Sequence, residues 1–204
     1  ATLANPNIHW ESVKQANIGF DVAMFQSRVN LSLDAYYKKT TDMLVKASIP
    51  ITSGFEDTST TYTNAGKVTN KGIELTLNTV NLKGALEWHT NVSYTYNKNK
   101  IVSLNSSTPY YINQINNSYV TMLADNYPIN VFYGYVTDGI FQTQEEVDNH
   151  AIQAGAEPGD IRFKDLNNDG VINDEDRTVI GNPNPTHLFS MGNTLSWKGF
   201  ELNI

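Results

Sequence analysis

Apolar and polar residues alternate with a period of two along five stretches of this chain. The first stretch, residues 17–24, places Ile18, Phe20 and Val22 on one face, with polar or small residues between them. The other stretches cover residues 29–38, 72–78, 86–97 and 187–197, and Asn193 interrupts the apolar face of the last. Because successive side chains of a strand point to opposite faces, the alternation predicts strands with one apolar and one polar side.

The predicted strands are long. Most of them run to roughly ten residues, whereas strands of globular proteins cluster near five or six and membrane-barrel strands need ~9–11. A soluble β-sandwich produces the same alternation, so the pattern by itself fits both folds. Strand length favours the wall of a membrane barrel.

Short and long connections also alternate along the chain. Short turns are expected at residues 26–27, 81–84 and 198–199, and outer-membrane barrels have such turns at the periplasmic end. The strand-like run 131–136 falls in a long connection, where one additional wall strand would break the up-and-down order. We therefore expect an all-β fold, an antiparallel transmembrane β-barrel segment with wall strands at about 13–39, 67–97 and 187–204 and extracellular loops at about 40–66 and 98–186.

Charge placement agrees with a membrane wall. An ionised side chain facing lipid costs a few kcal/mol at mid-membrane. The carboxylates in the predicted strands all fall on the polar face: Asp21, Asp34, Glu74 and Glu87. Lys39 and Lys71 are exceptions at strand ends, where long side chains reach the interface. The apolar face carries aromatic residues near strand ends, as an aromatic girdle requires: Trp88, Tyr94, Tyr96 and Trp197.

Composition excludes several classes of function. The chain has 14 Lys and Arg against 21 Asp and Glu, and the net charge of -7 has the wrong sign for a nucleic-acid partner. Cysteine is absent, so disulfides, thiolate zinc sites and a cysteine nucleophile are excluded. The sequence contains no G-x-S-x-G, phosphate-binding glycine loop or H-E-x-x-H motif, and its four histidines are scattered. We expect no enzymatic activity.

The two ends of the sequence suggest a piece of a longer protein. No apolar run approaches the ~18 residues of a membrane-spanning helix, and the first residues do not form a signal peptide. Residues 200–204 alternate like the opening of a further strand.

One motif carries metal chemistry. Residues 165–176 fit a twelve-residue calcium loop, in which Gly170 permits the sharp turn and Ile172 anchors the loop. The expected ligands are Asp165, Asn167, Asp169, the carbonyl of Val171, and Asp176. Position twelve is aspartate where an EF-hand usually has glutamate, as in the dockerin variant. An Asx-rich turn without metal remains the alternative. Upstream, Thr143 and Glu146 predict a capping box for a short helix through His150.

Several motifs together resemble the SusC/RagA family of TonB-dependent outer-membrane transporters. These are residues 5–11 (NPNIHWE), 32–37 (SLDAYY), 64–74 (NAGKVTNKGIE), 134–141 (GYVTDGIF), and the run from 158 to 183. The resemblance implies a barrel of about 22 strands with a plug, energised by TonB. It also implies a SusD-like surface lipoprotein that captures oligosaccharides or peptides, and contact with outer-membrane lipid.

Two other functions remain open from the sequence. The chain also fits a soluble, calcium-stabilised, carbohydrate-binding β-sandwich, or an adhesin-like surface barrel without transport. Substrate residues are not identified, because loop aromatics such as Tyr110 and Tyr111 either stack on sugars or pack internally.

Overall fold

The computed structural model describes residues 2–3, 5–48, 54, 60–104, 108–116 and 118–204. The chain divides into two compact units. We call residues Ala1–Ser107, Ala124–Pro128 and Asn184–Ile204 the wall unit, and residues Thr108–Leu123 and Ile129–Pro183 the loop unit. In the described residues, regular structure is mainly β-strand, with one short helix, α1 (Gln144–Asp148), and one 3-10 turn, η2 (Asp174–Asp176). The expected all-β fold is confirmed.

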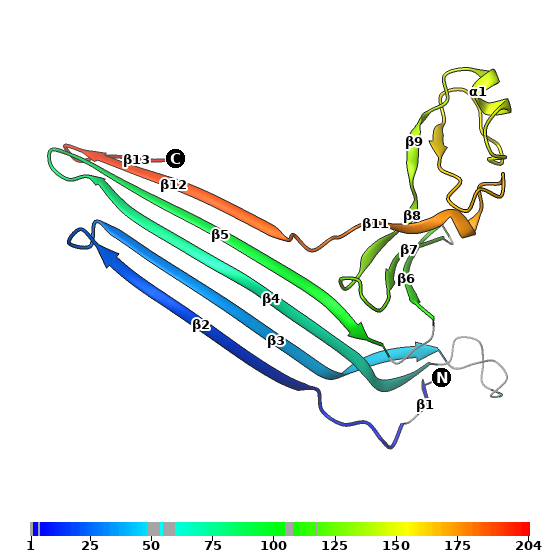
Figure 1. Ribbon diagram of the computed structural model, residues 1–204, viewed down its shortest axis with the longest axis horizontal. Coiled ribbons are helices and arrows are strands. Elements are labelled where there is room, and N and C mark those ends of the chain that lie inside the picture. Colours follow the sequence, from blue (N-terminus) through cyan, green and yellow to red (C-terminus); the bar gives the residue numbers. More distant parts are fainter. Residues whose placement is uncertain (1, 4, 49–53, 55–59, 105–107, 117) are drawn as a thin grey trace. The chain divides into compact units, whose positions relative to one another are not determined.

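Long antiparallel strands form the sheet of the wall unit, side by side in Figure 1. In spatial order they are β13 (Phe200–Asn203), β12 (His187–Trp197), β5 (Leu86–Ser103), β4 (Thr60–Leu82), β3 (Val29–Ser48) and β2 (Ser12–Met24). The two-residue strand β1 (Thr2–Leu3) pairs in parallel with β4. Strands β2 and β13 end this path, so the described strands form an arc and not a closed barrel.

Tight turns join these strands at one end of the sheet. Residues Phe25, Gln26 and Ser27 have φ of 54°, 58° and 63° between β2 and β3. Lys198 and Gly199 have φ of 47° and 86° between β12 and β13, as a two-residue type I′ hairpin requires. The β4–β5 turn occupies residues 83–85. The turns at residues 26–27 and 198–199 lie where the sequence predicts them, whereas the turn predicted at 81–84 begins two residues later, because β4 continues to Leu82.

The strands continue beyond the ends predicted from alternation. Residues 40–48 and 60–66 were expected in a loop, but β3 and β4 stay paired up to Ser48 and Thr60. The register shifts next to Asp42, whose φ is 60°. The prediction stopped early because residues 40–48 (TTDMLVKAS) do not alternate with a period of two: Met43, Leu44 and Val45 are three apolar residues in succession. Residues 49–53 and 55–59 of the expected loop lie outside the described part of the chain.

A small buried core lies at the far end of the wall unit from the tight turns. Val68, Ile101, Leu104 and Ala124 are each at most 8% exposed. The segment 124–128 pairs with β5, because Ile101 N donates to Tyr127 O (2.8 Å) and Asn126 N donates to Ile101 O (2.9 Å). These residues were expected in the loop 98–186, but they belong to the wall unit.

The loop unit contains two small sheets. Strands β11 (Arg177–Gly181), β8 (Val131–Tyr135), β7 (Ser118–Leu123) and β6 (Tyr110–Ile115) form one, and β9 (Thr137–Ile140) pairs with β10 (Ile161–Phe163) in the other. The strand-like run at residues 131–136 thus belongs to a separate sheet, in agreement with the up-and-down order of the long strands.

The helices in the described ranges are short. None has the length and hydropathy to cross a bilayer.

Candidate functional site

Strand register brings the apolar residues of the wall unit into continuous rows. Phe20 pairs with Leu33 and Leu33 with Leu75, and the row continues through Tyr94 to Phe189. The next row is Val22, Leu31, Leu77, Val92 and Met191. Five strands therefore share one apolar face. This face is the one that alternation predicts.

No described element covers much of this apolar face. Phe20 is 60% exposed, Phe189 69% and Met191 55%. Fully burying such a side chain is worth about 1.5–3 kcal/mol, and soluble monomers rarely leave large apolar patches in water. A hydrocarbon environment stabilises this face, whereas water does not.

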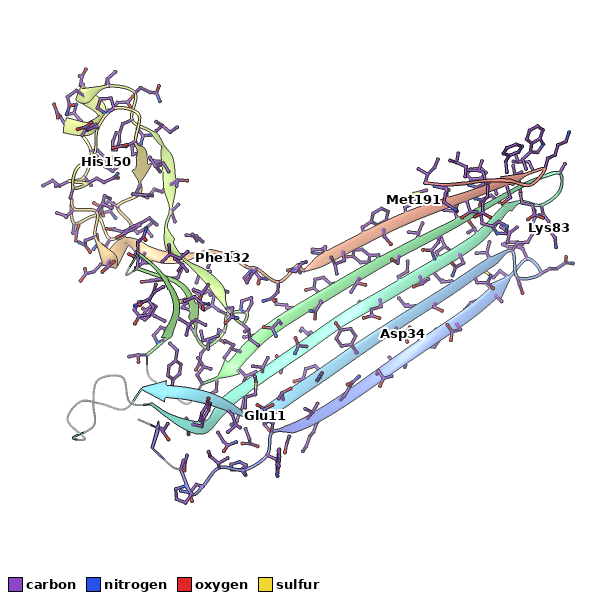
Figure 2. All side chains as sticks on the ribbon, turned by 180° about the vertical axis from the view of Figure 1, so that it is seen from behind. Glu11, Asp34, Lys83, Phe132, His150 and Met191 are labelled. Atoms are coloured by element: carbon purple, nitrogen blue, oxygen red, sulfur yellow. The ribbon has the colours of Figure 1, made fainter. Side chains whose placement is uncertain are left out.

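The opposite face is polar and internally hydrogen-bonded. Asp21, Ser32, Thr76, Ser93 and Ser190 form one cross-strand row. Ser32 donates to Asp21 and the hydroxyls of Ser93 and Ser190 lie 2.6 Å apart. Asp34 and Glu74 pair across β3 and β4 on the same face, and Figure 2 labels Asp34 on the long sheet. Two carboxylates side by side need solvent, so this face is suited to a water-filled lumen.

Asn193, which interrupts the apolar face, has its side-chain oxygen satisfied by two donors. Its Oδ1 accepts from Trp88 Nε1 (3.0 Å) and from Thr90 Oγ1 (2.7 Å). Asn81 Nδ2 also donates to Thr90 Oγ1 (2.6 Å). This polar row lies near the tight turns, where an interfacial tryptophan and its partners are expected.

The predicted calcium loop folds as a tight turn around Asp165. The Asp165 carboxylate accepts backbone N–H groups from Asn168 (2.6 Å), Gly170 (2.8 Å) and Asp169 (3.3 Å). Gly170 has a φ of 83°, the left-handed conformation expected of the sharp turn. Asp169 Oδ1 accepts from Val171 N (2.8 Å). Asx-turn geometry thus accounts for much of the loop without a metal.

The carbonyl of Val171 faces the interior side of this loop. Ile152 N donates to Gly170 O (2.8 Å) and Ile172 N donates to Ile152 O (2.9 Å). Because neighbouring residues of an extended chain present their backbone groups to opposite edges, the Val171 N–H and C=O point away from Ile152. That is the edge where Asp169 accepts the Val171 N–H. A seventh-position carbonyl ligand requires this orientation.

Asp176 closes the loop from a fully buried position. Its oxygens accept Leu166 N (2.8 Å) and Asn173 N (2.9 Å), and its exposure is 0%. The Asn173 N–H is the main reason that the pKa of Asp176 is lowered, and the Leu166 N–H acts in the same direction. Asn173 and Asp176 form a capping box around η2 that the sequence analysis missed. Its signal was an Asn followed three residues later by a carboxylate.

A calcium ion in this loop would depend on mixed oxygen ligands. Among the described residues, no three His, Cys, Asp or Glu side chains are grouped to hold a metal. Amide and backbone oxygens would have to complete the set, and calcium accepts both kinds. Each carboxylate has about four lone-pair positions, so Asp165 and Asp176 retain acceptor capacity. The residues therefore fit the ion in type and order.

The predicted capping box of α1 is only half formed. Glu146 N donates to Thr143 Oγ1 (3.3 Å), as predicted. The Glu146 carboxylate, however, accepts from Gln142 N (2.8 Å) and not from Thr143 N. The helix ends at Asp148, so its predicted extension to His150 was wrong.

Arg177 organises the aromatic side chains of the loop unit. Its guanidinium carbon lies 4.7 Å from the Tyr133 ring centroid and 5.6 Å from that of Tyr135. It also donates to Tyr119 O and lies 3.4 Å from Asp174 Oδ1. Tyr111 packs against Tyr133 with ring centroids 5.0 Å apart. This cluster shows no periodicity, so the sequence analysis did not find it.

Comparison with known proteins identifies the family. Residues 1–200 match the family described as TonB dependent receptor-like, beta-barrel. The chain belongs to this family. TonB-dependent receptor P3 of Formosa agariphila is 34% identical over 208 residues, which cover 99% of this chain and 20% of that protein. TonB-dependent receptor SusC of Bacteroides thetaiotaomicron is 26% identical, with 98% and 19% covered.

Solved structures agree with this identification. The RagAB peptide transporter matches with a TM-score of 0.75 and 25% identity, over 100% of this chain and 21% of that chain. The RagAB peptide importer in the closed-closed state matches with a TM-score of 0.74 and 24% identity, over the same shares. The resemblance to SusC/RagA receptors is confirmed. The chain spans about a fifth of the length of these relatives.

Family membership assigns the two-faced sheet to a barrel wall in the outer membrane. The apolar rows of this receptor chain are its lipid-facing side, and the polar rows face the inside of the barrel. The soluble sandwich is not favoured.

Proposed function

We propose that this chain forms part of the wall of a transporter that imports oligosaccharides or peptides. The continuous polar face from Asp21 to Ser190 is the observation that carries the proposal. Solute passes along this hydrated face while lipid contacts the opposite one. The proposal assigns no described residue a catalytic role and includes no enzymatic step.

The partners follow from the relatives. SusC and the RagAB peptide importer support a SusD-like surface lipoprotein that captures the substrate and delivers it to the barrel. TonB supplies energy through a plug domain, as the family description supports. In this assignment the tight turns face the periplasm, and the loop unit lies outside the cell.

Blocking the polar face tests the transport function. In the whole receptor, a single cysteine replaces Ser93, and a bulky thiol reagent is attached to it. The neighbouring residue Val92 faces lipid and provides the matched control. We expect labelling at residue 93 to reduce uptake of a labelled oligosaccharide or peptide, because the reagent occupies the hydrated path, and labelling at residue 92 to leave uptake unchanged. Equal uptake by the two labelled proteins would contradict the passage of solute along the polar face, and no uptake by the unlabelled receptor would favour a barrel without transport.

We further propose that calcium stabilises the turn at residues 165–176. Five oxygen donors in the expected order, the left-handed Gly170 and the direction of the Val171 carbonyl support the site. Asp165, Asn167, Asp169, Val171 and Asp176 would hold the ion, which would supply positive charge among these oxygens. The ion would brace the loop unit and take part in no reaction.

A calcium titration by calorimetry tests this site. Asp165→Asn is compared with wild type, because an amide retains one oxygen for the backbone N–H groups of the turn. Asp148→Asn, on the exposed helix α1, is the control of equal charge. We expect wild type and Asp148→Asn to bind calcium equally, and Asp165→Asn to bind at least about tenfold more weakly. Equal binding by all three proteins would remove calcium from the account.

A further inference from the structure

A group of lysines lies on the lipid-facing side of the wall unit, beyond the apolar rows. We call Lys14, Lys39, Lys71, Lys98 and Lys100 the lysine belt. Their positions follow the same alternation as Phe20, Leu33, Leu75 and Tyr94, so all five belong to the lipid-facing side. They occur on four adjacent strands, β2 to β5.

The belt occupies two consecutive cross-strand rows that follow the apolar rows in the direction away from the tight turns. The row that ends at His187 contains Ala35, Ile73 and Tyr96. The next row outward is Ala16, Tyr37, Lys71 and Lys98, and the one beyond it is Lys14, Lys39, Thr69 and Lys100. Along the strands, this face therefore changes from aliphatic residues through tyrosines to lysines. The same order is found where a lipid-facing surface passes from hydrocarbon into the membrane interface.

Like charges oppose one another directly within the belt. Lys14 pairs with Lys39, and Lys71 pairs with Lys98. Directly opposed like charges destabilise a sheet. In the described residues, none of the five lysines forms an ion pair with a carboxylate. The carboxylates Asp21, Asp34, Glu74 and Glu87 lie on the opposite face, and Asp42, further along β3, lies 3.6 Å from His9.

The five lysines of the belt therefore have no carboxylate partner. The apolar rows beside them indicate where the missing anions come from. At the surface of a bilayer, phosphate groups lie next to hydrocarbon, as the lysine rows lie next to the apolar rows. We propose that the lysine belt binds the phosphate groups of lipids in the leaflet on the side of the long connections. Each lysine contributes to the attraction as an ammonium group held at the level of the lipid head groups.

The chain supplies a matched control at its other end. The tight turns contribute three cations, Arg28, Lys83 and Lys198, and Figure 2 shows Lys83 at that end of the long strands, far from Glu11. The belt variant carries Lys39→Gln, Lys71→Gln and Lys98→Gln. The turn variant carries Arg28→Gln, Lys83→Gln and Lys198→Gln. Both remove three positive charges from the same sheet.

Binding is measured on the whole receptor in neutral-detergent micelles, with phosphatidic acid as the phosphorylated lipid. We expect the belt variant to bind roughly 10- to 100-fold more weakly than wild type, and the turn variant to change by less than about twofold. Inorganic phosphate is the second probe and should bind far more weakly than the lipid. Equal losses in both variants, or equal affinity for free phosphate and lipid, would overturn the proposal.

Folding of each variant is checked by the migration of unheated samples on a gel. If the belt variant does not fold, Lys71→Gln alone replaces it, with an expected loss of about fivefold. An unchanged affinity in that single variant would also overturn the proposal. The inference rests on the proposed orientation of the wall, but its measurement involves no transport. A negative result for lipid binding by the belt would leave the uptake experiment unaffected.

Discussion

The hydroxyl of Tyr36 donates a 3.0 Å hydrogen bond to Oδ1 of Asn97, although strand β4 lies between their strands. The bond spans β4 because Gly72 lies opposite both residues and has no side chain. A Cβ at Gly72 would lie 2.6 Å from the Tyr36 hydroxyl and would overlap the carbonyl oxygen of Tyr96. Glycine at this position lets the tyrosine ring cross the polar face of the wall.

Gly72→Ala should therefore destabilise the barrel. The new methyl group meets backbone as well as the Tyr36 ring, so the sheet itself must shift, at a cost of about 1–3 kcal/mol. Urea-induced unfolding of the whole receptor in detergent measures this loss. Gly84→Ala is the control, because a Cβ at Gly84 meets no atom within 4 Å. Equal stability of the two variants would show that the Tyr36 crossing does not constrain the wall.

Adjacent residues of β4 should respond oppositely to the same charge. Leu75 lies in an apolar row and Thr76 in a polar one. Leu75→Arg places a guanidinium in lipid and should cost about 2–4 kcal/mol near mid-membrane, whereas Thr76→Arg stays hydrated and should cost little. The free energy of unfolding from lipid vesicles measures both. A larger cost at Thr76 than at Leu75 would reverse the assignment of the two faces.

The loop unit should lose stability at alkaline pH. Burial, and then a hydrogen bond with Tyr111, raise the pKa of Tyr133 to about 12 from the ordinary value of 10.0. Tyr133 ionises at a lower pH in the unfolded chain than in the folded one. The stability that neutral Tyr133 contributes is therefore complete below pH 10 and is lost as the pH rises to about 12. Tyrosinate absorbance followed through this range should show a late titration step that is smaller in Tyr133→Phe, and Tyr135, whose pKa is also raised, contributes to what remains. A titration without a late step in wild type would contradict the packing of Tyr133.

The strands and faces of the wall were predictable because each strand has lipid on one side and water on the other. Phe20 and Asp21 alternate for that reason, and the register then aligned each row across five strands. The extension of β3 to Ser48 was not predictable in this way. Beyond Lys39 the residues no longer alternate with a period of two, and only backbone pairing to β4 reveals the strand.

Prediction of the loop unit succeeded for local turns and failed for long-range contacts. The left-handed turn at Gly170 follows from the spacing of Asp165, Asn167 and Asp169. Arg177 and Tyr133 are far apart in sequence, and no periodic pattern connects them. Asp176 was predicted as a metal ligand, and its full burial and its capping of η2 become visible only when Leu166 and Asn173 are placed around it.

The central claim is that one face of this sheet contacts lipid and the other contacts water. The chain contains no cysteine, so spin labels can be attached to single cysteines at positions 75, 76, 189 and 190 of the whole receptor, with any cysteines elsewhere replaced. Collision rates with oxygen, which concentrates in lipid, are compared with those of a water-soluble nickel chelate. We predict that positions 75 and 189 favour oxygen and that positions 76 and 190 favour nickel. Nickel access at all four positions, or the reverse pattern, would contradict the account.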